Sequence, residues 1–415
     1  MFFGAFNDNF FKSALVMLVT YRLADEAGLD ARILVTLSAG VFILPFFLFS
    51  ALAGQMADKY ERSGLVRKIK IAEIVVMGGA VLGFYLESVT FLMCILFLMG
   101  AQSAFFGPLK YSILPQHLGE RELIGANALV ETGTFLAILL GTIFGGLFVM
   151  SGGGVVLVSF LVLGIAAAGW WASRYIPPTR TIDPFLEFRF NIFRETWRVV
   201  DDVRPQRDIF LAVLGISWFY FVGSTFLSQF PTYAKMVIGA DERVATLFLA
   251  IFSVGIGIGS LACNSLLKGE VSGRYVPGAA VGMSVLSVLL YFASHRAPLM
   301  EGAPLIGMLD FLAVPANLAV LACLFGISFF GGLYIVPLYA IIQARSPEDR
   351  LAGVTACVNI TDSLFMFASS LGTAVLLALG CSIPQVFLAL AVLTVCAAFV
   401  VRGAVREQLR RRNAR

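Results

Sequence analysis

Residues 100–146 read GAQSAFFGPLKYSILPQHLGERELIGANALVETGTFLAILLGTIFGG, and this stretch decides the fold. It consists of two apolar runs joined by a short polar turn, with Lys110 near the end of the first run and Glu131 inside the second. An ionised side chain costs about 2.5–3.5 kcal/mol at the centre of a membrane helix, so such residues usually pair or line an aqueous cavity. The pattern therefore predicts two membrane helices that carry functional charges.

A second copy of this unit occupies residues 326–373, which read GISFFGGLYIVPLYAIIQARSPEDRLAGVTACVNITDSLFMFASSLGT. Tyr339 stands where the first copy has Lys110, and Asp362 stands where it has Glu131. A unit that repeats in the same orientation at about half the chain length is typical of a duplicated helix bundle. The acid therefore belongs to both copies, whereas the basic residue belongs to one.

The composition indicates a membrane protein. Hydrophobic residues make up 59% of the 415 residues and charged residues only 13%, whereas soluble domains carry about 25% charged residues. A membrane helix needs about 20 apolar residues. Twelve such segments can be marked, at roughly 2–22, 33–57, 70–87, 90–112, 124–149, 155–175, 208–234, 244–267, 276–293, 318–343, 351–379 and 384–402.

A polar stretch separates the first six segments from the last six. We therefore predict an all-α membrane protein with two six-helix bundles, residues 1–175 and 208–403, followed by a basic tail at 404–415. The linker at 176–207 interleaves aromatic residues with arginines. This pattern favours an amphipathic helix that lies on the lipids of an anionic inner leaflet.

The basic residues are distributed unevenly between the loops. Of the 30 Lys and Arg residues, 24 fall in the loops and tail on the side of both termini, and five fall in the loops on the other side. The positive-inside rule therefore predicts an integral membrane protein with both termini in the cytoplasm.

Charges inside the apolar segments sort onto particular helices. Asp8 and Lys12 are four residues apart on the first helix, which favours an ion pair. Asp362 lies about 16 Å into the eleventh segment, near the bilayer midplane. The acids Glu73 and Glu87 of the third segment are expected at its ends. Two interpretations remain open for the interior charges, a substrate cavity and purely structural pairing.

The loop after the second segment reads GQMADKYERSGLVRKIK, from Gly54 to Lys70. Gly-x-x-x-Asp followed by basic residues at this position resembles the signature loop of the major facilitator superfamily. The resemblance implies twelve helices and a conformational latch that biases open and closed states, formed here by Gly54, Asp58, Lys59, Arg67 and Lys68. The alternative is a basic loop that only sets topology.

Three stretches carry a more specific resemblance: FNDNFFK at 6–12, GPLKYSILPQ at 107–116 and GANALVE at 125–131. They look like the bacterial lysophospholipid transporter family, and most like its transporter domain when fused to an acyltransferase and an acyl carrier protein synthetase. The resemblance implies a flippase of the bacterial inner membrane. It would move lysophosphatidylethanolamine-like lipids from the outer to the inner leaflet for re-acylation, with that enzyme fused or separate and without an ion gradient.

The interior residues suit such a cargo. Lys110 and Lys12 can bind a phosphate, and Asp8, Glu131 or Asp362 can receive an ammonium group. The matched motifs also place two amides, Asn9 and Asn127, in the candidate substrate site. One departure is the seventh segment, which has no basic residue between Phe210 and Phe230.

Two alternatives remain open, and the second comes from another functional class. A proton-coupled major facilitator exporter of drugs or metabolites would use a midplane carboxylate such as Asp362. A membrane module that recruits an acyltransferase without moving substrate would use the basic linker and tail. Transport driven by a pH gradient would favour the exporter, and the absence of any transport would favour the recruiting module.

The sequence predicts no enzyme activity, cofactor, metal or nucleic-acid partner, because it contains no nucleophile motif, metal cluster or Walker motif. The run from Gly255 to Gly259 lies inside a span and follows no strand, so it predicts close helix packing rather than a nucleotide loop.

Overall fold

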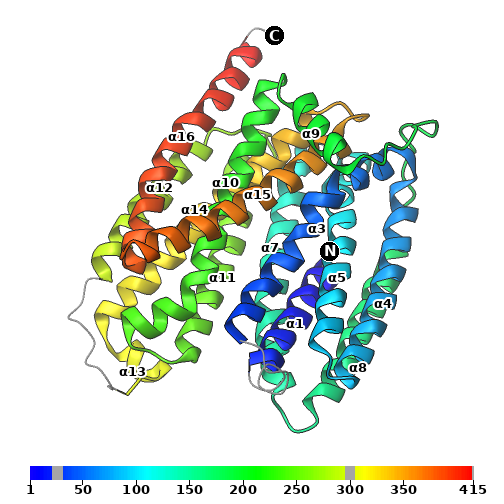
Figure 1. Ribbon diagram of the computed structural model, residues 1–415. Coiled ribbons are helices and arrows are strands. Elements are labelled where there is room, and N and C mark those ends of the chain that lie inside the picture. Colours follow the sequence, from blue (N-terminus) through cyan, green and yellow to red (C-terminus); the bar gives the residue numbers. More distant parts are fainter. Residues whose placement is uncertain (21–30, 295–303, 414–415) are drawn as a thin grey trace. The chain divides into compact units, whose positions relative to one another are not determined.

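The computed structural model describes residues 1–20, 31–294 and 304–413, and within them the chain is helical (Figure 1). Its α-helices are α1 (Phe2–Leu18), α3 (Ala31–Lys59), α4 (Arg62–Tyr85), α5 (Val89–Ser112), α6 (Leu114–His117), α7 (Leu123–Val149), α8 (Gly154–Ser173), α9 (Ile192–Val203), α10 (Arg207–Tyr233), α11 (Glu242–Leu267), α12 (Val276–Ala293), α13 (Met308–Ala313), α14 (Pro315–Arg345), α15 (Leu351–Ala378) and α16 (Ile383–Asn413). A 3₁₀ turn, η2 (Glu120–Glu122), precedes α7, and a π-helical turn, η3 (Ala234–Ile238), follows α10.

Nine helices in the described part of the chain are long and apolar enough to cross a membrane: α3, α5, α7, α8, α10, α11, α12, α14 and α15. Residues Ile383–Ala398 of α16 form a shorter apolar segment. α1 and α4 coincide with two further predicted segments, but α1 is short and α4 carries several charges in its first turns. The predicted all-α membrane architecture is thus confirmed.

The third predicted segment starts earlier than expected. α4 begins at Arg62 rather than at residue 70, because the Glu61 side chain caps it by accepting hydrogen bonds from the amides of Ser63 and Gly64. Because basic residues occupy the first turns of α4, the mean hydropathy there is low and does not indicate this start. As a result Glu73, predicted at the end of the segment, lies midway along α4 and is only 1% exposed.

The chain divides into two compact units. Unit 1 contains Met1–Gly119, Leu136–Pro205 and Arg345–Ser363, and unit 2 contains Glu120–Phe135, Gln206–Ala344 and Leu364–Arg415. The start of α15 therefore packs in unit 1 and the start of α7 packs in unit 2. Each unit thus includes a segment from the other half of the sequence.

Small residues allow close helix contacts inside each unit. In unit 1 a Cβ on Gly141 of α7 would lie 2.5 Å from the carbonyl oxygen of Phe6 on α1. In unit 2 a Cβ on Gly259 of α11 would overlap the backbone of Phe329 on α14. The packing role predicted for the run that ends at Gly259 is therefore confirmed.

Each unit has its own apolar core. In unit 1, helices α1, α4, α5 and α8 surround a cluster that includes Phe10, Phe84 and Met99. In unit 2 aromatic rings dominate, and Phe226 of α10 stacks on Phe387 of α16 with ring centroids 4.5 Å apart. These cores pack against the helices that carry the polar side chains described next.

Candidate substrate site and latch

A chain of hydrogen-bonded polar side chains crosses the apolar helices of unit 1. Asp8 of α1 accepts a hydrogen bond from the Ser103 hydroxyl of α5 at 2.6 Å. The same hydroxyl lies 3.2 Å from the amide oxygen of Gln102. The Gln102 amide nitrogen in turn donates to Glu73 of α4 at 3.3 Å. We call these residues, together with Lys70 and Asn7, the polar chain.

Glu73 is the centre of the polar chain. Besides Gln102, its carboxylate accepts from the Lys70 ammonium at 2.6 Å and from the Asn7 amide at 3.2 Å. Lys70 and Glu73 are both almost fully buried. A buried carboxylate is tolerated when it is paired and hydrogen-bonded, so this arrangement satisfies both charges.

The sequence prediction missed Lys70, Glu73, Gln102 and Ser103. One signal was available, because Lys70 and Glu73 are three residues apart, the spacing of a helical ion pair. Hydropathy places the start of this helix only at residue 70, so Lys70 looks like a residue of the preceding loop. Gln102 and Ser103 sit alone in an apolar run, where sequence does not reveal which helix they face.

The structure describes both Asp8 and Lys12, and the ion pair predicted between them is not formed. Asp8 is oriented by Ser103 on another helix. The Lys12 ammonium instead lies 5.4 Å from the centre of the Phe42 ring on α3, at cation–π distance. Asn9 donates to the carbonyl of Ala5 one turn earlier, at 2.8 Å.

Lys110 is partly buried near the end of α5, and its ammonium lies 4.8 Å from the centre of the Tyr111 ring. It lines a cavity of about 160 Å³ in unit 1 together with Lys70, Phe106 and Met1. The structure thus brings two lysine side chains, one predicted and one missed, to the same cavity.

Asn127 and Glu131 lie one turn apart on α7, in unit 2, and both side chains are fully buried. The Asn127 amide donates to the Gln343 side chain of α14 at 2.5 Å, and the Gln343 amide donates back at 3.1 Å. Asp362 belongs to unit 1 and is 8% exposed. The predicted substrate residues are therefore divided between the two units.

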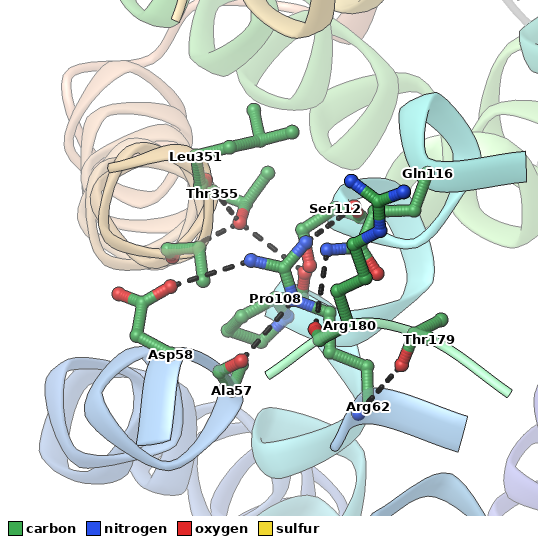
Figure 2. A network of polar contacts seen from close by, with 11 residues as sticks. Ala57, Asp58, Arg62, Pro108, Ser112, Gln116, Thr179, Arg180, Leu351 and Thr355 are labelled. Carbon is green, nitrogen blue, oxygen red and sulfur yellow. Dashed lines mark hydrogen bonds and ion pairs between the residues drawn. The ribbon is translucent and has the colours of Figure 1, made fainter. Parts of the chain in front are cut away.

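The predicted latch loop, residues 54–70, is organised by Arg62, which the sequence prediction did not include. The Arg62 guanidinium is ion-paired with Asp58 at 3.4 Å (Figure 2). It also donates to the carbonyl of Ala57 at 3.1 Å and to that of Ser112, at the end of α5, at 2.8 Å. Arg62 thus ties together α3, α4 and α5.

Gly54 lies where α3 meets the start of α15. A Cβ at this position would stand 3.0 Å from the Cβ of Ala356 and 3.2 Å from the carbonyl oxygen of Ala352, so only a glycine allows this approach without a shift. Beside it, the Thr355 hydroxyl of α15 lies 3.3 Å from the carbonyl oxygen of Pro108 on α5 (Figure 2). In unit 1, the start of α15 therefore packs against both α3 and α5.

The other predicted latch residues have different partners. Lys59 donates to the carbonyl of Leu186, and Arg67 donates to that of Ile176, at 2.8 and 3.0 Å. Lys68 is exposed. Two of the basic residues predicted to bridge helices therefore bind the linker.

Comparison with known proteins agrees with this architecture. The sequence model of the family described as Major Facilitator Superfamily matches residues 1–320. Two relatives named Lysophospholipid transporter LplT, from Cronobacter sakazakii and Klebsiella pneumoniae, are each 26% identical to the chain. These alignments cover 86% and 88% of this chain and 82% and 84% of the relatives.

Among solved structures, the chain is similar to the human organic anion transporter MFSD10 (TETRAN), with a TM-score of 0.73. The two share 12% sequence identity, and the match covers 96% of this chain and 97% of that one. A likeness at this identity shows the fold. Since the family model covers most of the sequence, the chain belongs to the major facilitator superfamily.

Proposed function

We propose that this protein transports lysophospholipids. The relatives named lysophospholipid transporters align over more than four fifths of the chain, which supports this substrate class. The observation that carries the proposal is that the apolar helices of unit 1 carry a hydrogen-bonded carboxylate, Asp8, and two lysines, Lys12 and Lys110. A lysophospholipid such as lysophosphatidylethanolamine needs both signs, because its head group joins a phosphate to an ammonium.

The two ends of such a head group find chemically matched partners. Asp8 has one carboxylate oxygen held by Ser103, which orients the carboxylate toward a bound ammonium. Lys110 and Lys12 act as point charges for the phosphate. Asn9, Asn127, Glu131 and Asp362 are further proposed substrate residues, and Glu131 and Asp362 are the repeat-equivalent acids.

We further propose the direction and the biological context. Lysolipids move from the outer to the inner leaflet of a bacterial inner membrane, where an acyltransferase/acyl carrier protein synthetase, fused or separate, re-acylates them. The chain itself acts as a transporter and not as an enzyme. The names of the relatives support the substrate class, and the resemblance to transporter domains of fused enzymes supports the context.

The proposed topology has twelve spans in two six-helix bundles, residues 1–175 and 208–403. α1, α4 and the apolar part of α16 supply the three spans beyond the nine that stand out by length and composition. Both termini lie in the cytoplasm, since 24 of the 30 Lys and Arg residues fall on that side. The Asp58–Arg62 loop then faces the cytoplasm.

The substrate class can be tested with the purified full chain in vesicles. Vesicles contain fluorescent lysophosphatidylethanolamine or the matching diacyl phosphatidylethanolamine, and added dithionite bleaches the lipid that remains in the outer leaflet. We expect the protein to accelerate exchange of the lysolipid between leaflets, and Asp8→Asn to abolish that acceleration. Equal acceleration of both lipids, or of neither, would refute the proposed substrate.

A further inference from the structure

The linker that follows α8 is bound along its length to the latch loop. Residues 176–190, here called the strap, have no regular secondary structure and run from α8 to α9 (Figure 1). Their backbone makes a series of hydrogen bonds to residues 55–67. The bonds join Arg67 to Ile176, Ser63 to Pro177, Glu61 to Thr179, Asp58 to Asp183, Lys59 to Leu186 and Gln55 to Arg189.

Glu61 binds the strap through two short hydrogen bonds. Its carboxylate accepts from the hydroxyl and the amide of Thr179 on the strap, at 2.6 and 2.7 Å, while it caps α4. Burial raises the pKa of Glu61, but the bonds from Thr179, Gly64 and Ser63 outweigh burial and lower that pKa to about 2. The attachment is therefore an ionised one at neutral pH.

The strap holds both partners of the latch ion pair. The Thr179 hydroxyl accepts from the Arg62 amide at 2.9 Å (Figure 2), and the Asp183 amide donates to the carbonyl of Asp58 at 3.0 Å. A displacement of the strap therefore moves the backbones of Asp58 and Arg62. Because the start of α15 packs on this same loop, the displacement also reaches the contact between α3 and α15.

In the helix that follows the strap, two polar residues are buried and the aromatic residues are exposed. α9 packs on α3 with Glu195 and Thr196 buried, and Asn191 caps its first turn. Its aromatic side chains point outward instead, with Phe193 71% and Trp197 69% exposed. A helix of a soluble protein usually buries such large apolar side chains.

The exposed aromatic face continues onto the strap and is accompanied by arginines. Phe185 and Phe190 of the strap are also exposed, and so are Arg189, Arg194 and Arg204. α9 packs against α3, and the strap begins just after α8 ends at Ser173, so both lie beside the ends of two membrane spans. Aromatic rings and arginines at this level are typical of a helix that lies in the head-group region of an anionic leaflet.

We propose that the aromatic face of α9 and the strap is a contact surface for an anionic bilayer, and that the strap conveys this contact to the Asp58–Arg62 latch. The contact stabilises the latch as it stands in the structure. Anionic lipid thereby controls how readily the latch opens, whichever substrate the protein carries.

The contact can be measured at Trp197. Replacing Trp170, Trp171 and Trp218 with Phe leaves Trp197 as the single tryptophan of the full chain, since the sequence has four. In vesicles of phosphatidylcholine and phosphatidylglycerol, we expect lipids brominated near the head group to quench its emission. A matched chain that keeps only Trp171, exposed on the span α8, is the positive control. Emission quenched by aqueous iodide but not by brominated lipid would refute the bilayer contact, as would burial of Trp197 by an added acyltransferase.

The coupling can be measured at Cys357, which is fully buried on α15, two residues from Thr355. With the other five cysteines replaced, the rate of maleimide labelling of Cys357 reports opening of this contact. We expect phosphatidylglycerol to slow the labelling of the parent by about fivefold. This factor corresponds to the binding free energy of one arginine at an anionic surface. Phe193→Ser with Trp197→Ser should abolish this slowing, and so should Gln55→Ala with Lys59→Met, which loosens the strap.

Phe160→Ser is the control, because Phe160 is an equally exposed aromatic residue on α8 outside the strap. It should respond to phosphatidylglycerol like the parent. An unchanged labelling rate in the parent, or an equal response in the Phe193/Trp197 double variant, would overturn the coupling. These readouts need no substrate, so they stand or fall separately from lysophospholipid transport.

Discussion

Asp58 and Arg62 form an ion pair one turn apart, at 3.4 Å, across the junction between α3 and α4. Arg62 is 1% exposed and also donates to the carbonyls of Ala57 and Ser112. The five donors and planar shape of a guanidinium suit this multiple contact, and a lysine cannot reproduce it. The relationship makes Arg62 the residue that holds three helices of unit 1 together.

Replacing Arg62 should therefore be costly for folding. Breaking a buried, hydrogen-bonded ion pair by removing one partner costs about 3 kcal/mol or more. We expect Arg62→Ala to lower the thermal midpoint of the detergent-solubilised protein well below that of Arg67→Ala, a control that loses one bond to Ile176. Equal midpoints for the two variants would contradict the role assigned to Arg62.

The Lys70–Glu73 pair can be tested by asking whether a second substitution restores the stability that the first one removes. Lys70→Met leaves the Glu73 carboxylate buried without its cation, and we expect a loss of about 3–5 kcal/mol of stability. The double variant Lys70→Met/Glu73→Gln removes both charges and should recover most of this loss. Thermal unfolding of the parent, the single variants and the double variant measures the coupling. Additive losses would show that the two residues do not act as a pair.

Much of this architecture could be predicted from sequence, because twenty-residue apolar runs have few other structural outcomes. α5, α12 and α15 begin and end within one residue of their predicted bounds. The start of α4 was missed because its capping residue, Glu61, and its basic first turns have the low hydropathy that is typical of a loop.

The candidate site was harder to predict, since its hydrogen bonds join residues far apart in the chain. Asp8 was assigned to Lys12 by local spacing, whereas its partner Ser103 lies 95 residues away on another helix. The Asn127–Gln343 amide pair joins residues 216 positions apart. Spacing rules describe neighbours on one helix, and they say nothing about which helix lies opposite.

The attachment of the strap at Glu61 should depend on pH in a defined window. The pKa of Glu61 is lowered from 4.5 to about 2 in the folded protein. A group with a lowered pKa stabilises the folded state fully above its ordinary value and loses this contribution as the pH falls toward the lowered one. The attachment should therefore hold above pH 4.5 and weaken between pH 4.5 and 2.

Amide hydrogen exchange of residues 176–190, corrected for the intrinsic rate at each pH, measures this attachment. In the parent we expect protection to fall within that window. Glu61→Gln should show weak protection with no such fall, because the glutamine has no charge to lose. Protection that is the same in parent and variant at every pH would contradict the attachment.

Lys110 is expected to serve the substrate rather than the fold. The repeat has Tyr339 at the equivalent position, so packing does not demand a cation there. We expect Lys110→Ala to lose most of the lysolipid exchange between leaflets while its thermal midpoint stays near that of the parent. Lys235→Ala, which removes an exposed lysine outside the latch and the proposed substrate residues, is the matched control and should keep full activity. Normal exchange by Lys110→Ala would remove Lys110 from the substrate site.

We propose that the chain moves a zwitterionic lysolipid without consuming a proton gradient. The most direct test is the rate of lysophosphatidylethanolamine exchange by the purified parent in vesicles with an imposed pH gradient, and again after a protonophore collapses it. We predict the same rate in both conditions, and little effect of Asp362→Asn compared with Glu131→Gln. Exchange that requires the gradient and is abolished by Asp362→Asn would contradict the claim and would identify a proton-coupled carrier instead.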